Sequence, residues 1–215
     1  MRFSTLFFDL DETLYPPGNG LWGEIRARIN AYMSERLGFS KEQVELLRER
    51  YFREYGTTLR GLQANYAVDM ADYLAFVHAI PVDRYLHPDP ELRAVLAGIP
   101  GRKFIFTNAD SNHAKRVLNA LGLEGLFDGI VDVYTIAPYC KPMPEAFPLA
   151  LAAAGGPDPS TCLLLDDQAR ITRAARQAGF FTVLVGKDGT SPDADATLMR
   201  LVDLPGLLGG GLGAS

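Results

Sequence analysis

Short apolar segments that run into polar residues are the feature that most limits how this chain can fold. Five segments have the length and composition of buried strands, at residues 3–8, 102–107, 130–135, 161–165 and 180–185. Helical patterns lie among them, at residues 91–97, 111–121, 144–154 and 168–178. Strands that alternate with helices form a parallel sheet with right-handed crossovers. The sequence therefore predicts an α/β fold built on a parallel sheet.

The stretch after the first strand has a different character and predicts helices only. Apolar residues recur at helical spacing from Leu21 to Leu37. Ser40 and Gln43 form a capping-box pattern that opens a second helix, which we expect to end near Tyr55. We expect a loop at residues 56–61 and a third helix at residues 66–79.

These patterns divide the chain into two predicted domains. Residues 1–15 and 91–215 form the sheet-containing core, and residues 16–90 form an all-helical cap inserted into it. Open parallel sheets bind ligands at the carboxyl ends of their strands. Because the insertion leaves the sheet at that edge, we predict that it acts as a lid over a site there.

Composition excludes several classes of protein. With 47% hydrophobic and 22% charged residues the chain is typical of a globular protein. Its net charge of −5 argues against a nucleic-acid partner. The apolar run at residues 3–8 is too short for a signal peptide or a membrane span, so we expect a cytoplasmic protein without a membrane partner. Cys140 and Cys162 have no zinc-ligand spacing, and we expect two buried free thiols. The glycine-rich residues 208–215 are expected to fray.

Four polar motifs follow the predicted strands, and together they predict one site. They are Asp9-Leu10-Asp11-Glu12-Thr13, Thr107-Asn108, Lys141-Pro142 and Asp166-Asp167. Each motif alone is weak evidence, since an Asp-x-Asp pair after a strand is more often a turn or a helix cap. Their common place at the carboxyl ends of parallel strands is much harder to attribute to chance.

The residue types in these motifs indicate phosphoryl chemistry. Four close aspartates are unfavourable unless positive charge lies among them, and Lys141 supplies only one. The remaining ligands are hard oxygens, which favours Mg²⁺. An aspartate can act as a nucleophile and form an acyl phosphate. A second carboxyl two residues later can protonate the leaving oxygen, and we expect its neighbours to raise its proton affinity.

At this point the sequence resembles the haloacid dehalogenase (HAD) superfamily of phosphatases, whose four motifs it shows in the family's order across nearly the whole chain. The resemblance implies a Rossmann-like parallel-sheet core with an inserted cap. It implies that Asp9 is the nucleophile and Asp11 the general acid/base. Thr107, Asn108 and Lys141 would hold the phosphoryl group, with Lys141 also catalytic. The implied Mg²⁺ ligands are Asp9, Asp11 through its carbonyl, Asp166 and Asp167.

A finer resemblance points to the pyrimidine 5′-nucleotidase branch. It rests on residues 7–15, on residues 55–62 and on the run from Thr107 to Leu118 that includes His113. It implies an enzyme that removes the phosphate of UMP or CMP, so the partner is a small phosphorylated metabolite. We assign Arg60 as the cap residue that contacts the substrate, by hydrogen bonds to the base or the ribose.

The fourth motif departs from the family pattern. Related proteins often read Asp-Asp-Ser-x-x-Asn, whereas Gln168 and Ile171 stand at the serine and asparagine positions here. This puts the support of the metal site in question. His113 is a candidate for orienting the substrate or the lid, or for local hydrogen bonding. The aromatic residues of the cap can stack on a base or simply pack.

Other functions remain open at this stage. A phosphatase or mutase acting on a sugar phosphate or another small phosphometabolite is the main alternative. A dehalogenase would not need Asp11, and a phosphonate hydrolase would want a cap lysine, for which Lys41 is a poor candidate. A receiver domain would place its lysine last, whereas Lys141 precedes Asp166. A scaffold protein without activity would be expected to lack Asp9 or Asp11.

Overall fold

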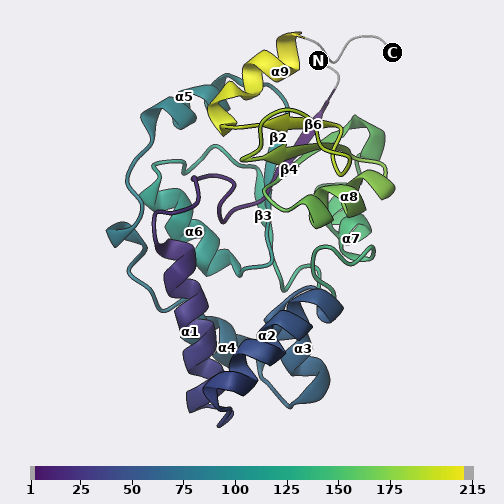
Figure 1. Cartoon of the computed structure of the whole chain (residues 1–215). Coiled ribbons are helices and arrows are strands. Elements are labelled where there is room, and N and C mark those ends of the chain that lie inside the picture. Colours follow the sequence, from purple (N-terminus) through teal and green to yellow (C-terminus); the bar gives the residue numbers. More distant parts are fainter. Residues whose placement is uncertain (1–2, 211–215) are drawn as a thin grey trace.

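The computed structural model describes residues 3–210 of the chain. Six strands of these residues form one sheet in the order β3-β2-β1-β4-β5-β6 (Figure 1). The strands are β1 (Thr5–Phe8), β2 (Arg102–Phe106), β3 (Gly129–Val131), β4 (Cys162–Asp166), β5 (Phe181–Val185) and β6 (Ala196–Leu198). Every neighbouring pair runs parallel. The predicted α/β fold with a parallel sheet is confirmed.

Helices surround this sheet and form a separate group beyond one end of it (Figure 1). The α-helices are α1 (Leu21–Glu35), α2 (Lys41–Tyr55), α3 (Thr58–Asn65), α4 (Met70–Val77), α5 (Pro90–Gly98), α6 (Ser111–Ala120), α7 (Ala146–Ala153), α8 (Ala169–Gln177) and α9 (Leu204–Gly210). Three short 3₁₀ turns are η1 (Val82–Arg84), η2 (Pro159–Thr161) and η3 (Leu201–Asp203).

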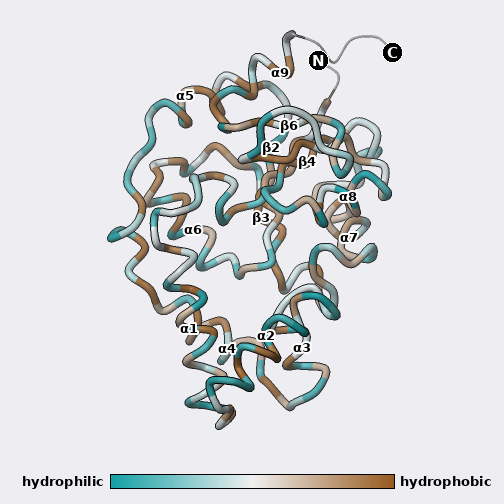
Figure 2. Tube along the Cα trace, viewed as in Figure 1, coloured by the Kyte–Doolittle hydropathy of each residue, from teal (hydrophilic) through white to brown (hydrophobic). Residues whose placement is uncertain are grey.

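The central strand β1 shows why the sheet is covered on both faces. Leu6 and Phe8 belong to an apolar cluster that includes Val117 of α6. Phe7 points to the opposite face and packs with Phe147 of α7 in a second cluster. Side chains alternate across a strand, so a strand that is apolar at every position needs cover on both sides. Figure 2 shows the hydrophobic residues along the central strands.

Helices α1 to α4 pack on one another at the end of the molecule away from α9 (Figure 1). Their buried residues, such as Ile25, Met33 and Val44, join the same apolar cluster as Leu6 and Phe8. The helical character predicted for residues 16–90 is therefore present. The capping box at the start of α2 is also present, since the Ser40 hydroxyl accepts from the backbone of Gln43 and the Gln43 side chain accepts from the backbone of Ser40.

Two helices of this group differ from the prediction. The expected loop at residues 56–61 is wrong, because Thr57 caps α3 by accepting a hydrogen bond from the backbone N–H of Arg60. The third predicted helix begins later than expected, at Met70, where the Asp69 side chain caps it. Threonine and aspartate are favoured at the N-cap because their side chains accept hydrogen bonds from the free backbone N–H groups of the first helical turn.

Strand β3 and helix α6 also depart from the sequence-based boundaries. The strand expected at residues 130–135 ends at Val131, because the Asp132 side chain accepts hydrogen bonds from the backbone and the hydroxyl of Thr135 and forms a turn. Asp110, not Ser111, caps α6 by accepting from the backbone N–H of His113. These side chains compete with the backbone for local hydrogen bonds.

Three further expectations concern the cysteines, membranes and the C-terminus. Cys140 and Cys162 are buried free thiols, as predicted. Within residues 3–210, none of the helices combines the length and the apolar character needed to cross a membrane. The end that was expected to fray from residue 208 continues as α9 to Gly210, and residues 211–215 lie outside the described residues.

Candidate active site

The candidate site lies at the carboxyl ends of the three central strands. Phe8 of β1 is paired with Ile105 of β2 and Leu165 of β4, so the residues that follow these strands come out side by side. The chain leaves β1 toward β2 and later returns on the other side of β1 as β4. Ligands of open parallel sheets bind where the strand order reverses in this way.

Lys141 stands between two of the predicted aspartates. Its Nζ donates to Asp9 Oδ1 at 2.8 Å and to Asp166 Oδ2 at 2.7 Å, and its side chain is fully buried. Burial alone would lower the pKa of Lys141, but the charges of Asp166 and Asp9 raise it above its usual value. Lys141 therefore stays protonated and holds both carboxylates in place.

The acidic residues outnumber this single cation. One carboxylate oxygen each of Asp9, Asp166 and Asp167 lies within 4.8 Å of the others. Burial raises the pKa of Asp9 despite the opposing charge of Lys141, and the carboxylates of Asp166 and Asp167 raise it further. Burial and the Asp166 charge raise the pKa of Asp167 to about 7. The cluster is short of positive charge.

A divalent cation fits this cluster. Asp167 Oδ1 is buried and makes no hydrogen bond to any atom of residues 3–210. Together with Asp9 and Asp166 it offers three carboxylate oxygens, the donor type that Mg²⁺ prefers. Two excess negative charges around one lysine would be offset by such an ion.

Asp11 lies beside the cluster but its carboxylate faces other partners. Tyr15 donates its hydroxyl to Asp11 Oδ1 at 2.7 Å, and His113 Nε2 lies 3.0 Å from the same oxygen. We expected the neighbouring carboxylates to raise the pKa of Asp11, and this is wrong. Burial does raise it, but the charge of His113 and the hydrogen bonds from His113 and Tyr15 outweigh burial and lower the pKa below its usual value.

The turn after Asp11 has an unusual backbone. Glu12 has φ of 61°, the single non-glycine residue with positive φ among those described. A non-glycine residue in this region is strained, and such residues cluster at functional sites. The turn also lets Thr13 donate its hydroxyl back to Asp9 Oδ2 at 3.3 Å.

His113 is a site residue that the sequence singled out without a definite role. It is fully buried, and its ring stacks on His78 with centroids 4.3 Å apart. His78 in turn lies 2.5 Å from Asp110, the residue that caps α6. The structure thus brings His113 to Asp11 and ties it to the end of α4 through His78.

Thr107 and Asn108 follow β2 as predicted. The Thr107 oxygen accepts from the backbone N–H of Ala109 at 3.0 Å, which leaves its hydroxyl hydrogen for another acceptor. Asn108 pairs with the backbone of Lys141 in both directions, donating to its carbonyl at 2.9 Å and accepting from its N–H at 2.8 Å. Asn108 therefore fixes the loop that carries Lys141.

The structure also shows where Gln168 and Ile171, the two departures in the fourth motif, lie. The backbone N–H of Gln168 donates to Asp166 Oδ1 at 2.9 Å, a contact that does not depend on the side chain at position 168. The Gln168 side chain accepts from Arg170 at 3.0 Å. Ile171 is buried in the apolar cluster around Phe7. Asp166 is therefore held by the main chain at Gln168 and by the Lys141 side chain, without a contribution from the side chain at position 168.

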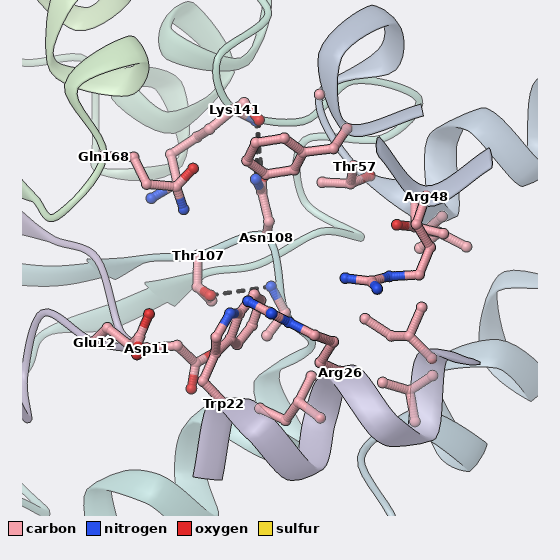
Figure 3. A pocket seen from close by; sticks show the side chains of 18 of the residues that line it. Asp11, Glu12, Trp22, Arg26, Arg48, Thr57, Thr107, Asn108, Lys141 and Gln168 are labelled. Carbon is pink, nitrogen blue, oxygen red and sulfur yellow. Dashed lines mark hydrogen bonds between the residues drawn. The ribbon is translucent and has the colours of Figure 1, made fainter. Parts of the chain in front are cut away.

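A cavity of about 580 Å³ opens above these residues. Asp9, Asp11, Thr107, Lys141 and Asp167 line one side. Helices α1 to α4 line the other with mostly apolar side chains, which include Trp22, Ile25, Ile29, Phe52, Tyr73 and Val77. Figure 3 shows the two sides facing each other across the cavity. This volume suits a small metabolite.

Arg60 does not line this cavity, so its assignment as a substrate ligand is wrong. It is 6% exposed and donates to the carbonyls of Tyr139 and Val133 and to the side chain of Gln63. The sequence suggested a loop here, where an arginine would be free. In α3 the side chain instead joins this helix to the loop that follows β3.

Three arginines that sequence reasoning did not assign to the site do line the cavity. They are Arg26, Arg48 and Arg170. Arg170 donates to the carbonyls of Phe52 and Gly56 and lies over the Phe52 ring at 3.5 Å. Arg26 and Arg48 come from α1 and α2 (Figure 3). Helical periodicity in the sequence does not show which residues of α2 will face the sheet-containing core.

Comparison with known proteins gives one family and several relatives. Residues 3–179 match the family model of the haloacid dehalogenase-like hydrolases. Phosphate metabolism protein 8 of Saccharomyces cerevisiae is 31% identical over 192 residues, which are 83% of this chain and 60% of that protein. The chain thus spans only about 60% of the length of this relative.

A second curated relative has nearly the same length as this chain. The phosphoglycolate phosphatase of Caulobacter vibrioides is 27% identical over 213 residues, which are 94% of this chain and 89% of that protein. Among solved structures, a predicted phosphoglycolate phosphatase from Haemophilus somnus has a TM-score of 0.63 at 18% identity and covers 97% of this chain and 99% of its own. At this identity the likeness shows the fold alone.

Proposed function

Because the chain belongs to the haloacid dehalogenase-like hydrolase family, we propose that it is a phosphatase that hydrolyses small phosphomonoesters through an aspartyl phosphate on Asp9. The observation that carries the proposal is the placement of Lys141 between Asp9 and Asp166, in a buried cluster where three carboxylates face this one cation. Such a site attracts a phosphoryl group together with a divalent cation.

The proposed reaction has two steps. In the first, a carboxylate oxygen of Asp9 attacks phosphorus, the ester P–O bond breaks, and the leaving oxygen takes a proton from Asp11. In the second, Asp11 takes a proton from water, the water oxygen attacks phosphorus, and the acyl–phosphate bond breaks to release phosphate and restore Asp9. After the second step, Asp9 and Asp11 are back in the states in which they began.

His113 and Tyr15 position the acid/base for these steps. Both contact Asp11 Oδ1, so this carboxylate is held in one orientation. The charge of His113 and the hydrogen bonds from His113 and Tyr15 lower the pKa of Asp11. Thr107 and Lys141 are placed to hold the phosphoryl oxygens by hydrogen bonds.

Mg²⁺ fits the carboxylates of Asp9, Asp166 and Asp167, and we propose it as the cofactor with the Asp11 carbonyl as a further ligand. When bound, it would offset the charge on the phosphoryl oxygens as a Lewis acid.

We further propose that residues 16–90 act as a cap that covers the substrate. The support is the second wall of the cavity, which α1 to α4 supply. A lid that closes over the reaction excludes water and selects the leaving group.

The finer proposal for the substrate is a pyrimidine nucleoside 5′-monophosphate such as UMP or CMP. It rests on the motif resemblance of residues 7–15, 55–62 and 107–118, and on rings such as Trp22 and Tyr73 that line the cavity and could stack on a base. A sugar phosphate or another small phosphometabolite is the alternative. A panel of both classes, assayed for phosphate release with and without Mg²⁺, decides between them.

The Asp9→Asn variant tests the reaction class. We expect it to lose phosphatase activity by at least about a thousandfold, because an amide cannot form the acyl phosphate. Asp83→Asn, at an exposed aspartate away from the cavity, is the matched control and should keep full activity. Substantial turnover by purified Asp9→Asn, with circular dichroism confirming its fold, would contradict the proposed nucleophile.

A further inference from the structure

Arg26 and Arg48 differ from the other cations of the cavity. Lys141 is bound by two carboxylates, and Arg170 by carbonyls and Gln168. Among residues 3–210, Arg26 and Arg48 have no hydrogen bond or ion pair recorded, and Arg48 Nε is buried from solvent without a partner. A buried donor without an acceptor costs free energy, so such a group indicates a missing partner.

Both guanidinium groups point into the cavity. Figure 3 shows Arg26 reaching from α1 and Arg48 from α2 toward the space between the cap helices and the strand ends. Burial lowers the pKa of Arg48, and the charge of Arg26 lowers it further. Arg26 also lies within electrostatic reach of Glu12, next to Asp11. The two arginines therefore reach from the cap into the cavity, and Arg26 lies nearer the phosphoryl end.

Nearby acidic residues do not neutralise this pair. Glu45 and Glu49 also line the cavity from α2 and are exposed, as is Arg26, and neither glutamate forms an ion pair with Arg26 or Arg48. Glu45 and Tyr73 favour the charged form of Arg48 only from a longer distance. Two like charges that face one cavity repel each other, and an anion placed between them would remove that cost.

We propose that Arg26 and Arg48 bind a second anionic group of the substrate, a phosphate or a carboxylate, on the cap side of the cavity. Guanidinium groups match both anions through paired N–H donors. The inference rests on the proposed phosphatase function and narrows its substrate class. Bisphosphates and phosphorylated acids satisfy both arginines, and a nucleotide does so when its ribose carries a second phosphate.

The test compares substrates that differ only in the second anion. Uridine 3′,5′-bisphosphate is paired with UMP, and 2-phosphoglycolate with 2-hydroxyethyl phosphate. We expect kcat/KM to be at least about tenfold higher for one doubly anionic member, since hydrogen bonds to charged groups are worth about this factor. Preference in the first pair identifies a phosphate, and preference in the second a carboxylate.

Variants assign the preference to the two arginines. Arg48→Gln and Arg26→Gln should each reduce it about tenfold, mainly through KM, because binding is lost equally in the ground and transition states. Their activity on p-nitrophenyl phosphate, which lacks the second anion, should change less than about threefold. Arg53→Gln, at an exposed arginine of α2 outside the cavity, is the matched control.

Two results would overturn the inference. One is a wild-type enzyme that shows no preference in either pair, and the other is a preference that both variants keep. If no phosphomonoester is hydrolysed at all, the proposed function fails instead. Calorimetric binding of uridine 3′,5′-bisphosphate and 2-phosphoglycolate to Asp9→Asn, with and without Arg48→Gln, then decides the role of the arginines without turnover.

Discussion

Lys141 is the side chain on which the acidic edge depends. It holds Asp9 and Asp166 at hydrogen-bonding distance, and its burial excludes water from both contacts. Removing one member of such a buried group leaves charges without a partner, which is far more costly than losing a surface ion pair. The ammonium group proposed to act in catalysis therefore also stabilises the fold.

Asp110 links the site to the stability of the protein in acid. Burial alone would raise the pKa of Asp110, but the contact with His78 and the backbone N–H of His113 lower it to about 2. The folded pKa lies below the unfolded value, so this carboxylate stabilises the fold above pH 4 and loses that effect as the pH falls toward 2.

Asp110→Asn should therefore destabilise the protein in a pH-dependent way. Asparagine can still cap α6, so the change chiefly removes the charge. We expect a loss of about 2 kcal/mol at pH 7 and about half of that at pH 3. Urea unfolding at both pH values measures it, with Asp83→Asn as the control. An equal loss at the two pH values would contradict the assigned role.

At the level of helices, arginines repeatedly bind the carbonyls at helix ends. Arg170 takes those of Phe52 and Gly56 at the end of α2, and Arg116 takes those of His78 and Ile80 after α4. The last carbonyls of a helix lack partners within it and carry partial negative charge. Here each arginine comes from a sheet-flanking helix and its acceptors from the α1–α4 group.

Gly61 shows how a single position fixes the packing of two helices. A Cβ at this residue of α3 would lie 2.1 to 2.6 Å from the buried side chain of Tyr51 in α2. The glycine is thus required by close packing between helices, whereas in the sequence it looked like part of a loop.

Gly61→Ala should destabilise the protein by about 1–3 kcal/mol, because overpacking forces the two helices apart. Gly23→Ala, in α1, is the matched control, since nothing lies within 4 Å of its Cβ. It should be neutral or stabilising by up to about 1 kcal/mol. Thermal unfolding of both variants measures the difference, and equal melting temperatures would contradict this account of Gly61.

These helices also show what the sequence could predict. The start of α2 was predictable, because Ser40 and Gln43 cap it with their own side chains. The location of α3 was not, because Gly56 and Gly61 near a short helix resemble a loop until the packing of Tyr51 is known. A local sequence signal identifies a helix when the interactions that fix the helix are made by residues close together in the sequence.

The same distinction between local signals and long-range packing applies to the candidate site. Asp9, Thr107, Lys141 and Asp166 could be predicted to meet because parallel strands bring their carboxyl ends to one edge. Arg48 could not, since its place depends on how the α1–α4 group stands over the sheet. Arg60 was misassigned for the same reason.

Considered as one molecule, the protein carries a buried charge imbalance that a cation should relieve. We expect Mg²⁺ at about 100 times its Kd to stabilise the fold by about 2.7 kcal/mol, which raises the melting temperature by about 5–10 °C at this chain length. Potassium at matched ionic strength is the control. An identical melting temperature with both salts would contradict the metal site.

Asp167→Asn separates metal binding from general salt effects. The variant loses a carboxylate that is crowded by Asp166, so its metal-free stability should equal or exceed that of the wild type. It should also lose most of the Mg²⁺-induced stabilisation, because one of the three clustered ligands is gone. A variant that is stabilised by Mg²⁺ as much as the wild type would exclude Asp167 as a ligand.

The hydrogen bonds from arginines to main-chain carbonyls have an evolutionary consequence. A carbonyl is present whatever side chain its residue carries, so the hydrogen bonds from Arg170 and Arg116 to the α1–α4 group remain when the side chain of an acceptor residue changes. Side chains that line the cavity can then be exchanged without detaching the helices that present them. The range of substrates can therefore change, in evolution or by combined mutation of cavity-lining positions, while the α1–α4 group stays bound to the rest of the protein.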